Sequence, residues 1–230
     1  MDTINVYAIP GFREPVNSLS HFLAAGVFAV LSYFLVRRGR GNWCRATSLA
    51  TMAVTSVFLL SMSGVYHLLG NGTGRYVMKQ LDVAGVFALI AGSVTPVHAI
   101  LFTGLQRWGP LLLVWAAAAT GITLRVVFWD SFPEGLGIGI FLLMGWGGAI
   151  TCKQLWRRYG YRFIAPLLWG GVAYTVGAII LGLDWPTVIP GVVGAHELWH
   201  VGVLLGLGLH WKFVFQFAGG PPRTRAASRR

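Results

Sequence analysis

Two histidines four residues apart, His196 and His200, lie in the segment AHELWHV near the end of the chain. In an α-helix this spacing places both imidazole rings on one face, about one turn apart, where both can bind one metal ion. His67, in SMSGVYHLL, is a third candidate ligand. Three neutral imidazoles with an open fourth position are typical of a catalytic zinc site. These three histidines are therefore the predicted metal ligands, although an isolated histidine in an apolar helix is more often a packing residue.

Three further polar residues accompany the histidines: Ser63, Asp82 and His21. Asp82 could orient a ligand or hold a water molecule on the metal, and Ser63 lies four positions before His67 on the same helical face. Each residue also has a simpler interpretation. Ser63 could bond its own helix backbone, Asp82 could favour a helix N-terminus, and His21 could support or pack against the site. We predict catalytic roles for Asp82 and Ser63.

The segments that carry these residues are too apolar for a water-soluble protein. Of the 230 residues, 55% are hydrophobic and only 11% are charged, against about 25% charged in soluble domains. Seven apolar stretches approach the roughly 20 residues that cross a bilayer, and they run over 18–36, 46–70, 80–104, 108–128, 135–152, 163–183 and 195–217. We predict an all-α membrane protein, a seven-transmembrane helix bundle. The bundle would cover residues 18–217, between an N-terminal segment (1–17) and a basic disordered tail (218–230).

This topology predicts which polar residues can meet. The second helix ends, and the first, third and seventh helices begin, on the same side of the membrane. The candidate site residues therefore lie at similar depth near one end of the bundle. His98 lies about 24 Å beyond Asp82 along its helix, and His210 about 21 Å beyond His196. Both are predicted to be interfacial residues rather than ligands.

The basic residues indicate orientation rather than a nucleic-acid partner. The formal net charge is +11, but the Lys and Arg residues fall between the apolar stretches and in the tail. Of the 18 Lys and Arg residues, 14 lie on the side of the C-terminus. Because cytoplasmic loops are enriched in these residues, the C-terminus is predicted to be cytoplasmic and the N-terminus outside. The expected location is a cell membrane, namely a bacterial inner membrane. No nucleic-acid partner is expected.

Five motifs in this order resemble the hemolysin III family, the bacterial branch of the progestin and adipoQ receptor (PAQR) family. They are EPVNSLSH (14–21), SGVYH (63–67), LDVAG (81–85), AGSVTP (91–96) and HELWHV (196–201). The resemblance implies a seven-helix fold and one zinc ion held by His67, His196 and His200. Ser63 and Asp82 would fill the other site positions, with Asp82 against the zinc-bound water. The best-known eukaryotic receptors of this family place their N-terminus in the cytoplasm, opposite to the orientation that the basic residues predict here.

Three functions fit these observations. The leading hypothesis is a zinc-dependent hydrolase of a lipid amide or ester, because the wider superfamily that the motifs resemble includes lipid-amide hydrolases. A second is a non-enzymatic receptor, lipid sensor or regulator of membrane state with structural zinc. A third is an intramembrane protease, because HELWH matches HExxH with Glu197 as base, although His67 would then be unexplained. Membrane lipid is the expected partner, and the sequence does not indicate an oligomeric state.

Overall fold

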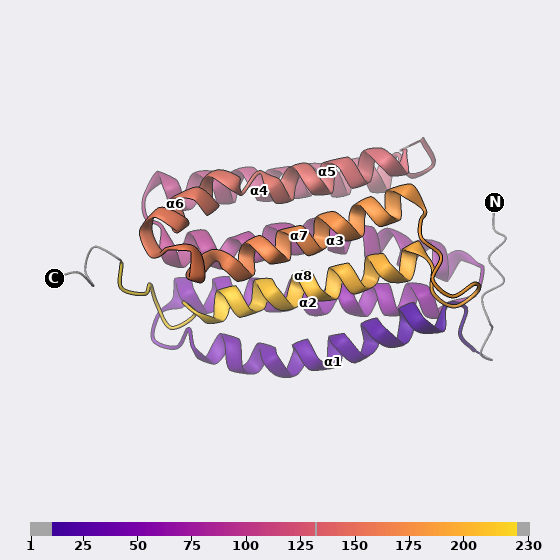
Figure 1. Ribbon diagram of the computed structural model, residues 1–230, viewed down its shortest axis with the longest axis horizontal. Coiled ribbons are helices and arrows are strands. Elements are labelled where there is room, and N and C mark those ends of the chain that lie inside the picture. The colour runs from indigo at the N-terminus through magenta and orange to yellow at the C-terminus, as the bar shows by residue number, and fades with distance from the viewer. Residues whose placement is uncertain (1–10, 132, 225–230) are drawn as a thin grey trace.

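A computed structural model describes residues 11–131 and 133–224 of the chain. Helices run through the whole described part (Figure 1), namely α1 (Pro15–Arg37), α2 (Trp43–Leu68), α3 (Thr73–Leu101), α4 (Leu105–Val127), the short 3-10 helix η1 (Trp129–Ser131), α5 (Glu134–Trp146), α6 (Ala149–Tyr159), α7 (Tyr161–Leu183) and α8 (Ala195–Phe215). Helices α5 and α6 follow each other as one apolar span, Gly135–Tyr159, so the described residues contain seven spans long and apolar enough to cross a membrane. The predicted seven-helix membrane fold is confirmed.

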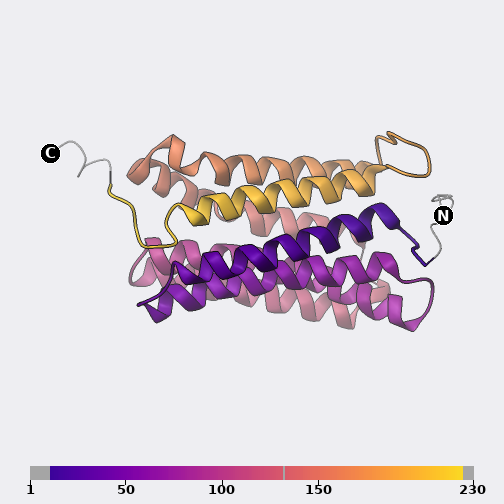
Figure 2. The ribbon, with the colours of Figure 1, turned by 90° about the horizontal axis from the view of Figure 1, so that it is seen from below.

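The helices run along the long axis of the molecule and alternate in direction. Helix α2 packs between α1 and α3, and α7 packs against α8. Helix α8 also lies beside α1, which both views show (Figures 1 and 2). The end of α2 and the starts of α1, α3 and α8 therefore lie at the same end of the bundle, as the predicted topology requires.

Glycine allows the close approach of α2 and α3, which fixes the positions of the residues that they carry. A Cβ atom on Gly92 would lie 2.1 Å from the Thr55 hydroxyl oxygen, and one on Gly85 would lie 3.0 Å from Leu59. Small residues of this kind let membrane helices pack backbone against backbone. The contact holds the end of α2 and the early turns of α3 in a fixed relation.

Two helix boundaries differ from the prediction in ways that matter for the site. Helix α3 begins at Thr73 rather than near residue 80, so Asp82 lies well inside the helix. The alternative that Asp82 favours a helix N-terminus is therefore wrong. The span predicted over 135–152 continues as helix to Tyr159, because its basic side chains can extend from the bilayer edge into water without ending the helix.

The predicted segments at the two ends are only partly within the described residues. Helix α1 begins at Pro15, inside the N-terminal segment predicted over 1–17, because proline is well suited to the first turn of a helix. Residues 1–10 lie outside the described part. Helix α8 ends at Phe215, and residues 225–230 are not described, so the disorder of the tail 218–230 stays a prediction.

Candidate metal centre

The three predicted ligands come together at one end of the bundle. His67 lies in the last turn of α2, and His196 and His200 lie in the first two turns of α8. Each residue contributes one ring nitrogen, Nδ1 or Nε2, and these three nitrogens all lie within 4.8 Å of one another. The ring centroids of His67 and His200 are 4.7 Å apart, and those of His196 and His200 are 4.9 Å apart. The histidines thus form a compact cluster that could hold a metal ion.

The hydrogen-bonding state of the cluster supports this assignment. His67 Nε2, His196 Nε2 and His200 Nδ1 are buried and have no hydrogen-bond partner within the described residues. Leaving a buried polar atom unsatisfied costs about 1–3 kcal/mol. A single metal ion would satisfy all three nitrogens at once, so the donor set fits a metal.

Glu14, immediately before α1, fixes the orientation of the His67 ring. Its carboxylate and His67 Nδ1 form a hydrogen bond, which leaves Nε2 as the atom that faces the cluster. Arg75 donates to the same carboxylate and also to the Tyr66 carbonyl at 2.8 Å. Burial raises the pKa of Glu14, but its hydrogen bonds and the nearby charges outweigh burial and lower it to about 2. A carboxylate that holds a histidine in this way is a common support of metal ligands.

Glu14 was not predicted as a site residue. It stands in the motif EPVNSLSH, but nothing in its local sequence shows that it reaches the end of α2. The backbone supplies that contact, because the Glu14 N–H donates to the His67 carbonyl at 3.1 Å and the Arg13 N–H donates to the Leu68 carbonyl at 3.3 Å. The available signal was its place in that motif, immediately before a proline-started helix.

If the cluster holds a metal ion, replacing Glu14 with glutamine is expected to weaken the binding of added zinc about 10- to 100-fold, because the support of the His67 ring would be lost. The measurement is the zinc dissociation constant, obtained by competition with a chromogenic chelator. Arg13→Gln is a matched control. Arg13 Nε lies 3.7 Å from Glu14 Oε1, and among the described residues the Arg13 side chain makes no contact with His67. Equal zinc affinity of Glu14→Gln and wild type would show that Glu14 does not support the metal site.

Ser63 and Asp82 pair at the same end of the bundle. The Asp82 carboxylate accepts a hydrogen bond from the Ser63 hydroxyl, so Ser63 links α2 to α3 instead of bonding only its own backbone. Both residues line the cavity that His196 and His200 also line. The structure therefore brings together the residues predicted as catalytic and two of the three predicted ligands around one space.

His21 packs against the cluster. Its ring stacks on that of His200, with centroids 4.0 Å apart and ring planes 18° apart. Both of its ring nitrogens are buried without a partner among the described residues. The close stack limits the orientations open to the His200 ring, which fits the supporting role considered from the sequence.

Glu197 has a structural position within HELWH. One carboxylate oxygen accepts the Gly194 N–H at 2.8 Å and caps the start of α8, while the other accepts from the Asn17 side chain at 2.8 Å. Both oxygens are thus occupied by bonds that hold α8 against α1. A general base needs an oxygen free to take a proton, so this arrangement does not favour a protease in which Glu197 is the base.

His98 and His210 lie away from the cluster, as predicted, and neighbouring helices cover His98. It is buried, with Nδ1 bonded to the Gln106 carbonyl at 2.8 Å and Nε2 near the Thr151 hydroxyl at 3.2 Å. These contacts join α3 to the start of α4 and to α6. His210 is partly buried, and its Nε2 is enclosed. Axial distance along a helix gives the end of the bundle at which a residue lies, but it does not show whether neighbouring helices cover that residue.

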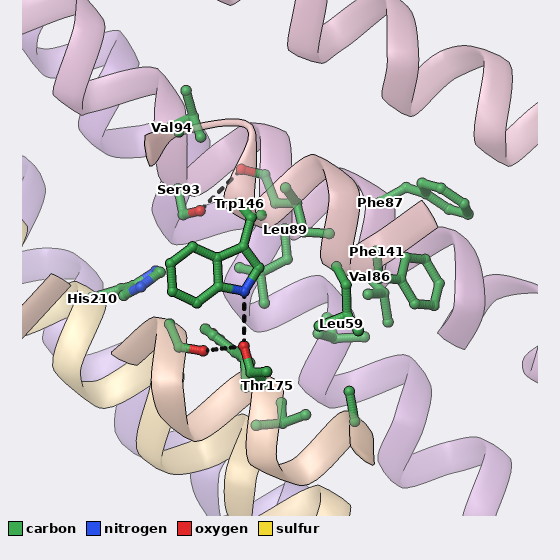
Figure 3. A pocket seen from close by; sticks show the side chains of 18 of the residues that line it. Leu59, Val86, Phe87, Leu89, Ser93, Val94, Phe141, Trp146, Thr175 and His210 are labelled. Carbon is green, nitrogen blue, oxygen red and sulfur yellow. Dashed lines mark hydrogen bonds between the residues drawn. The ribbon is translucent and has the colours of Figure 1, made fainter. Parts of the chain in front are cut away.

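A cavity of about 1060 Å³ extends from the histidine cluster along the inside of the bundle. Asp82, His196 and His200 line one end, and His98 lies along its wall further on. The wall between them is largely apolar, and Figure 3 shows Leu59, Val86 and Phe141 in it. The Trp146 indole N–H donates to the Thr175 hydroxyl at 3.0 Å and links α5 to α7 there (Figure 3). A volume of this order accommodates a molecule as large as a drug or a lipid chain.

Comparison with known proteins places this arrangement in a family. A profile described as "Haemolysin-III related" matches residues 11–211, which include the histidine cluster, Glu14 and Asp82. The chain belongs to the haemolysin-III-related family. The family resemblance inferred from the five motifs is therefore confirmed.

Three known proteins are similar to this chain over most of its length. Hemolysin-3 of Bacillus cereus is 27% identical over 200 residues, which cover 84% of this chain and 86% of that protein. The Hemolysin-3 homolog of Bacillus subtilis (strain 168) is 24% identical over 196 residues, covering 84% and 89%. An uncharacterized protein of Schizosaccharomyces pombe is 26% identical over 228 residues, covering 89% of this chain but 51% of that protein. The similarity to the two bacterial proteins extends over most of each chain.

Proposed function

We propose that this haemolysin-III-related protein is a zinc-dependent hydrolase of a lipid amide or ester. The observation that carries the proposal is the position of the histidine cluster at one end of a largely apolar cavity, beside a hydrogen-bonded serine and aspartate. A site of this kind combines a place for a polar reacting group with room for an apolar chain. Lipids offer both parts in one molecule.

Zinc is the proposed metal because the donors are three imidazoles. Such a set, with one position open, suits catalytic zinc. His67, His196 and His200 would hold the ion. When bound, zinc would polarise the substrate carbonyl as a Lewis acid and lower the pKa of a water molecule toward about 7.

The protein's own residues would then position the substrate and move the proton. The Asp82 carboxylate would accept a proton from the attacking water, whose oxygen forms the new bond to the carbonyl carbon. As the bond from that carbon to the leaving nitrogen or oxygen breaks, Asp82 would return the proton to the leaving atom. The Ser63 hydroxyl would hold the carboxylate in place. The cavity wall would take the acyl chain and keep bulk water away.

We also propose that the histidine end of the bundle faces outside the cell. Most Lys and Arg residues lie at the opposite end, around the α1–α2 connection, in α6 and in the tail. The positive-inside rule places that end in the cytoplasm. Substrate would then reach the site from the outer half of the membrane.

Hydrolysis of a long-chain N-acyl amide or ester by the purified protein tests this function. We expect fatty acid release that EDTA removes and that added zinc restores, because the cluster is the proposed reaction centre. In right-side-out vesicles, EDTA outside should have the same effect if the site faces outward. Release that is insensitive to chelation in detergent would contradict the zinc mechanism. Inhibition of inside-out vesicles only would reverse the proposed orientation.

A further inference from the structure

The end of the bundle that holds the histidine cluster carries only four of the 18 Lys and Arg residues, and two of these line the cavity. Arg13 and Arg75 form ion pairs with Glu14. Lys79 on α3 and Arg125 near the end of α4 are the two that line the cavity. Charged side chains that face the inside of a membrane protein are costly, so they often mark the path or the binding site of a substrate.

Trp129, in η1, contacts both of these cations. The Lys79 ammonium nitrogen lies 5.5 Å from the centroid of the Trp129 ring, and the Arg125 guanidinium carbon lies 4.3 Å from it. Arg125 is only 8% exposed, and Lys79 is half-buried. Both side chains have further interactions within the chain. An anionic ligand group would therefore join cations that the protein already holds at this end of the cavity.

One face of α3 shows the order of polar and apolar groups along the cavity. The lining residues Lys79, Asp82, Val86, Ile90 and Val97 share this face, because they follow a spacing of three or four residues or its multiple. Lys79 precedes Asp82 by three residues, so it lies about 4.5 Å nearer to the start of the helix. The α3 residues that line the cavity after Asp82 are mostly apolar, and Figure 3 shows Val86 among them.

The Lys79 ammonium is also near the proposed reaction centre. Its charge acts on the Asp82 carboxylate of its own helix and on His196 of α8. These two residues line the same end of the cavity from different helices. The ammonium is therefore within electrostatic reach of a group bound between α3 and α8.

These positions determine where each part of a substrate would lie. With its carbonyl at the histidine cluster, the acyl chain would extend along the apolar wall and the leaving group toward Lys79. In an N-acyl α-amino acid, three bonds of about 1.3–1.5 Å join the amide carbonyl carbon to the carboxylate carbon, so these atoms lie at most about 4 Å apart. That separation is close to the axial offset of about 4.5 Å between Asp82 and Lys79. The positive charge of Lys79 would also offset the repulsion between this carboxylate and Asp82.

We propose that the substrate is an N-acyl amino acid whose carboxylate binds Lys79, with Arg125 as a second cation at the same end of the cavity. This inference rests on the proposed function and adds the chemical class of the leaving group. The oxygen of water would join the carbonyl carbon, the bond to the amide nitrogen would break, and that nitrogen would take the proton. A fatty acid and a free amino acid would result. Lys79 would determine specificity and would contact only the carboxylate.

The test is the binding of two sulfonamides that resist hydrolysis, N-hexadecylsulfonylglycine and N-hexadecylsulfonylethanolamine. They share the chain and the sulfonamide group, but the first ends in a carboxylate and the second in a hydroxyl. Displacement of a fluorescent fatty acid from the purified protein gives both dissociation constants. We expect wild type to bind the glycine compound about 10- to 100-fold more tightly, the range for a hydrogen bond to a charged group.

Three variants separate recognition by Lys79 from a general effect of charge or fold. Lys79→Gln should lose most of the preference and keep its affinity for the ethanolamine compound, whereas Lys79→Arg should retain most of the preference. Lys153→Gln is the matched control, because Lys153 lines the opposite end of the cavity, on α6. It should retain the full preference.

Four results would overturn the inference. They are equal binding of both compounds by wild type, binding of neither compound, an unchanged preference in Lys79→Gln, and loss of the preference in Lys153→Gln. Each would leave the proposed hydrolase intact, because the chelation assay decides that function separately.

Discussion

Replacing both His196 and His200 with alanine is expected to reduce bound zinc from about one ion per chain to almost none. The two residues supply two of the three nitrogens in the cluster, and His67 alone cannot hold zinc at neutral pH against water. The measurement is elemental analysis of protein purified without chelator and after reconstitution with zinc. A correctly folded variant should elute from gel filtration as wild type does.

The matched control is His98→Ala together with His210→Ala. These histidines lie in the same helices as Asp82 and His200 but outside the cluster. The control should keep about one zinc per chain. If wild type binds no zinc even after reconstitution, the hydrolase proposal is wrong. Full zinc content in the His196, His200 variant would place the metal elsewhere.

Replacing Asp82 with asparagine is expected to slow hydrolysis about 10²- to 10⁴-fold while zinc content stays unchanged. Asparagine keeps the shape of the side chain but cannot take the proton from water. The measurement combines the turnover number with zinc analysis of the same sample. Ser63→Ala should have a smaller effect, because Ser63 acts on the reaction only through its bond to Asp82.

Glu197→Gln is the control that separates the hydrolase from the protease alternative. Glutamine can still accept the Gly194 N–H, so the cap of α8 should survive. We expect near-normal turnover. If this substitution abolishes activity while Asp82→Asn does not, the HExxH mechanism would be correct. Loss of zinc in Asp82→Asn would instead make Asp82 a ligand and the site a closed, structural one.

The histidine cluster could be predicted from the sequence, because its position follows from simple rules. The four-residue spacing places His196 and His200 on one helical face, and alternating spans bring the end of the second helix to the same side as the start of the last. Both rules depend only on helix geometry and membrane thickness. The exact ends of the helices mattered little, since the three histidines lie within a turn or two of them.

The supports of the site could not be predicted in the same way. The bond between Glu14 and His67 joins residues 53 positions apart and depends on how the chain enters α1. The pairing of Asn17 with Glu197 depends on α1 and α8 lying side by side, although they are the first and last helices. The cavity depends on how closely α5 and α6 pack against α3 and α7. No spacing rule within one segment gives such distances.

The packing of α8 against α1 also sets the order of steps in the assembly of the protein. During synthesis the early helices enter the membrane with only His67 of the ligand set, because His196 and His200 arrive with the last span. The Asn17 side chain has no Glu197 to bind until then. If the histidine cluster holds the proposed metal ion, loading must follow insertion of α8, and a chain truncated before α8 would lack the ion even if its other helices were correctly inserted. In the cell, occupancy of the proposed site would then report that α8 has been inserted and has packed against α1.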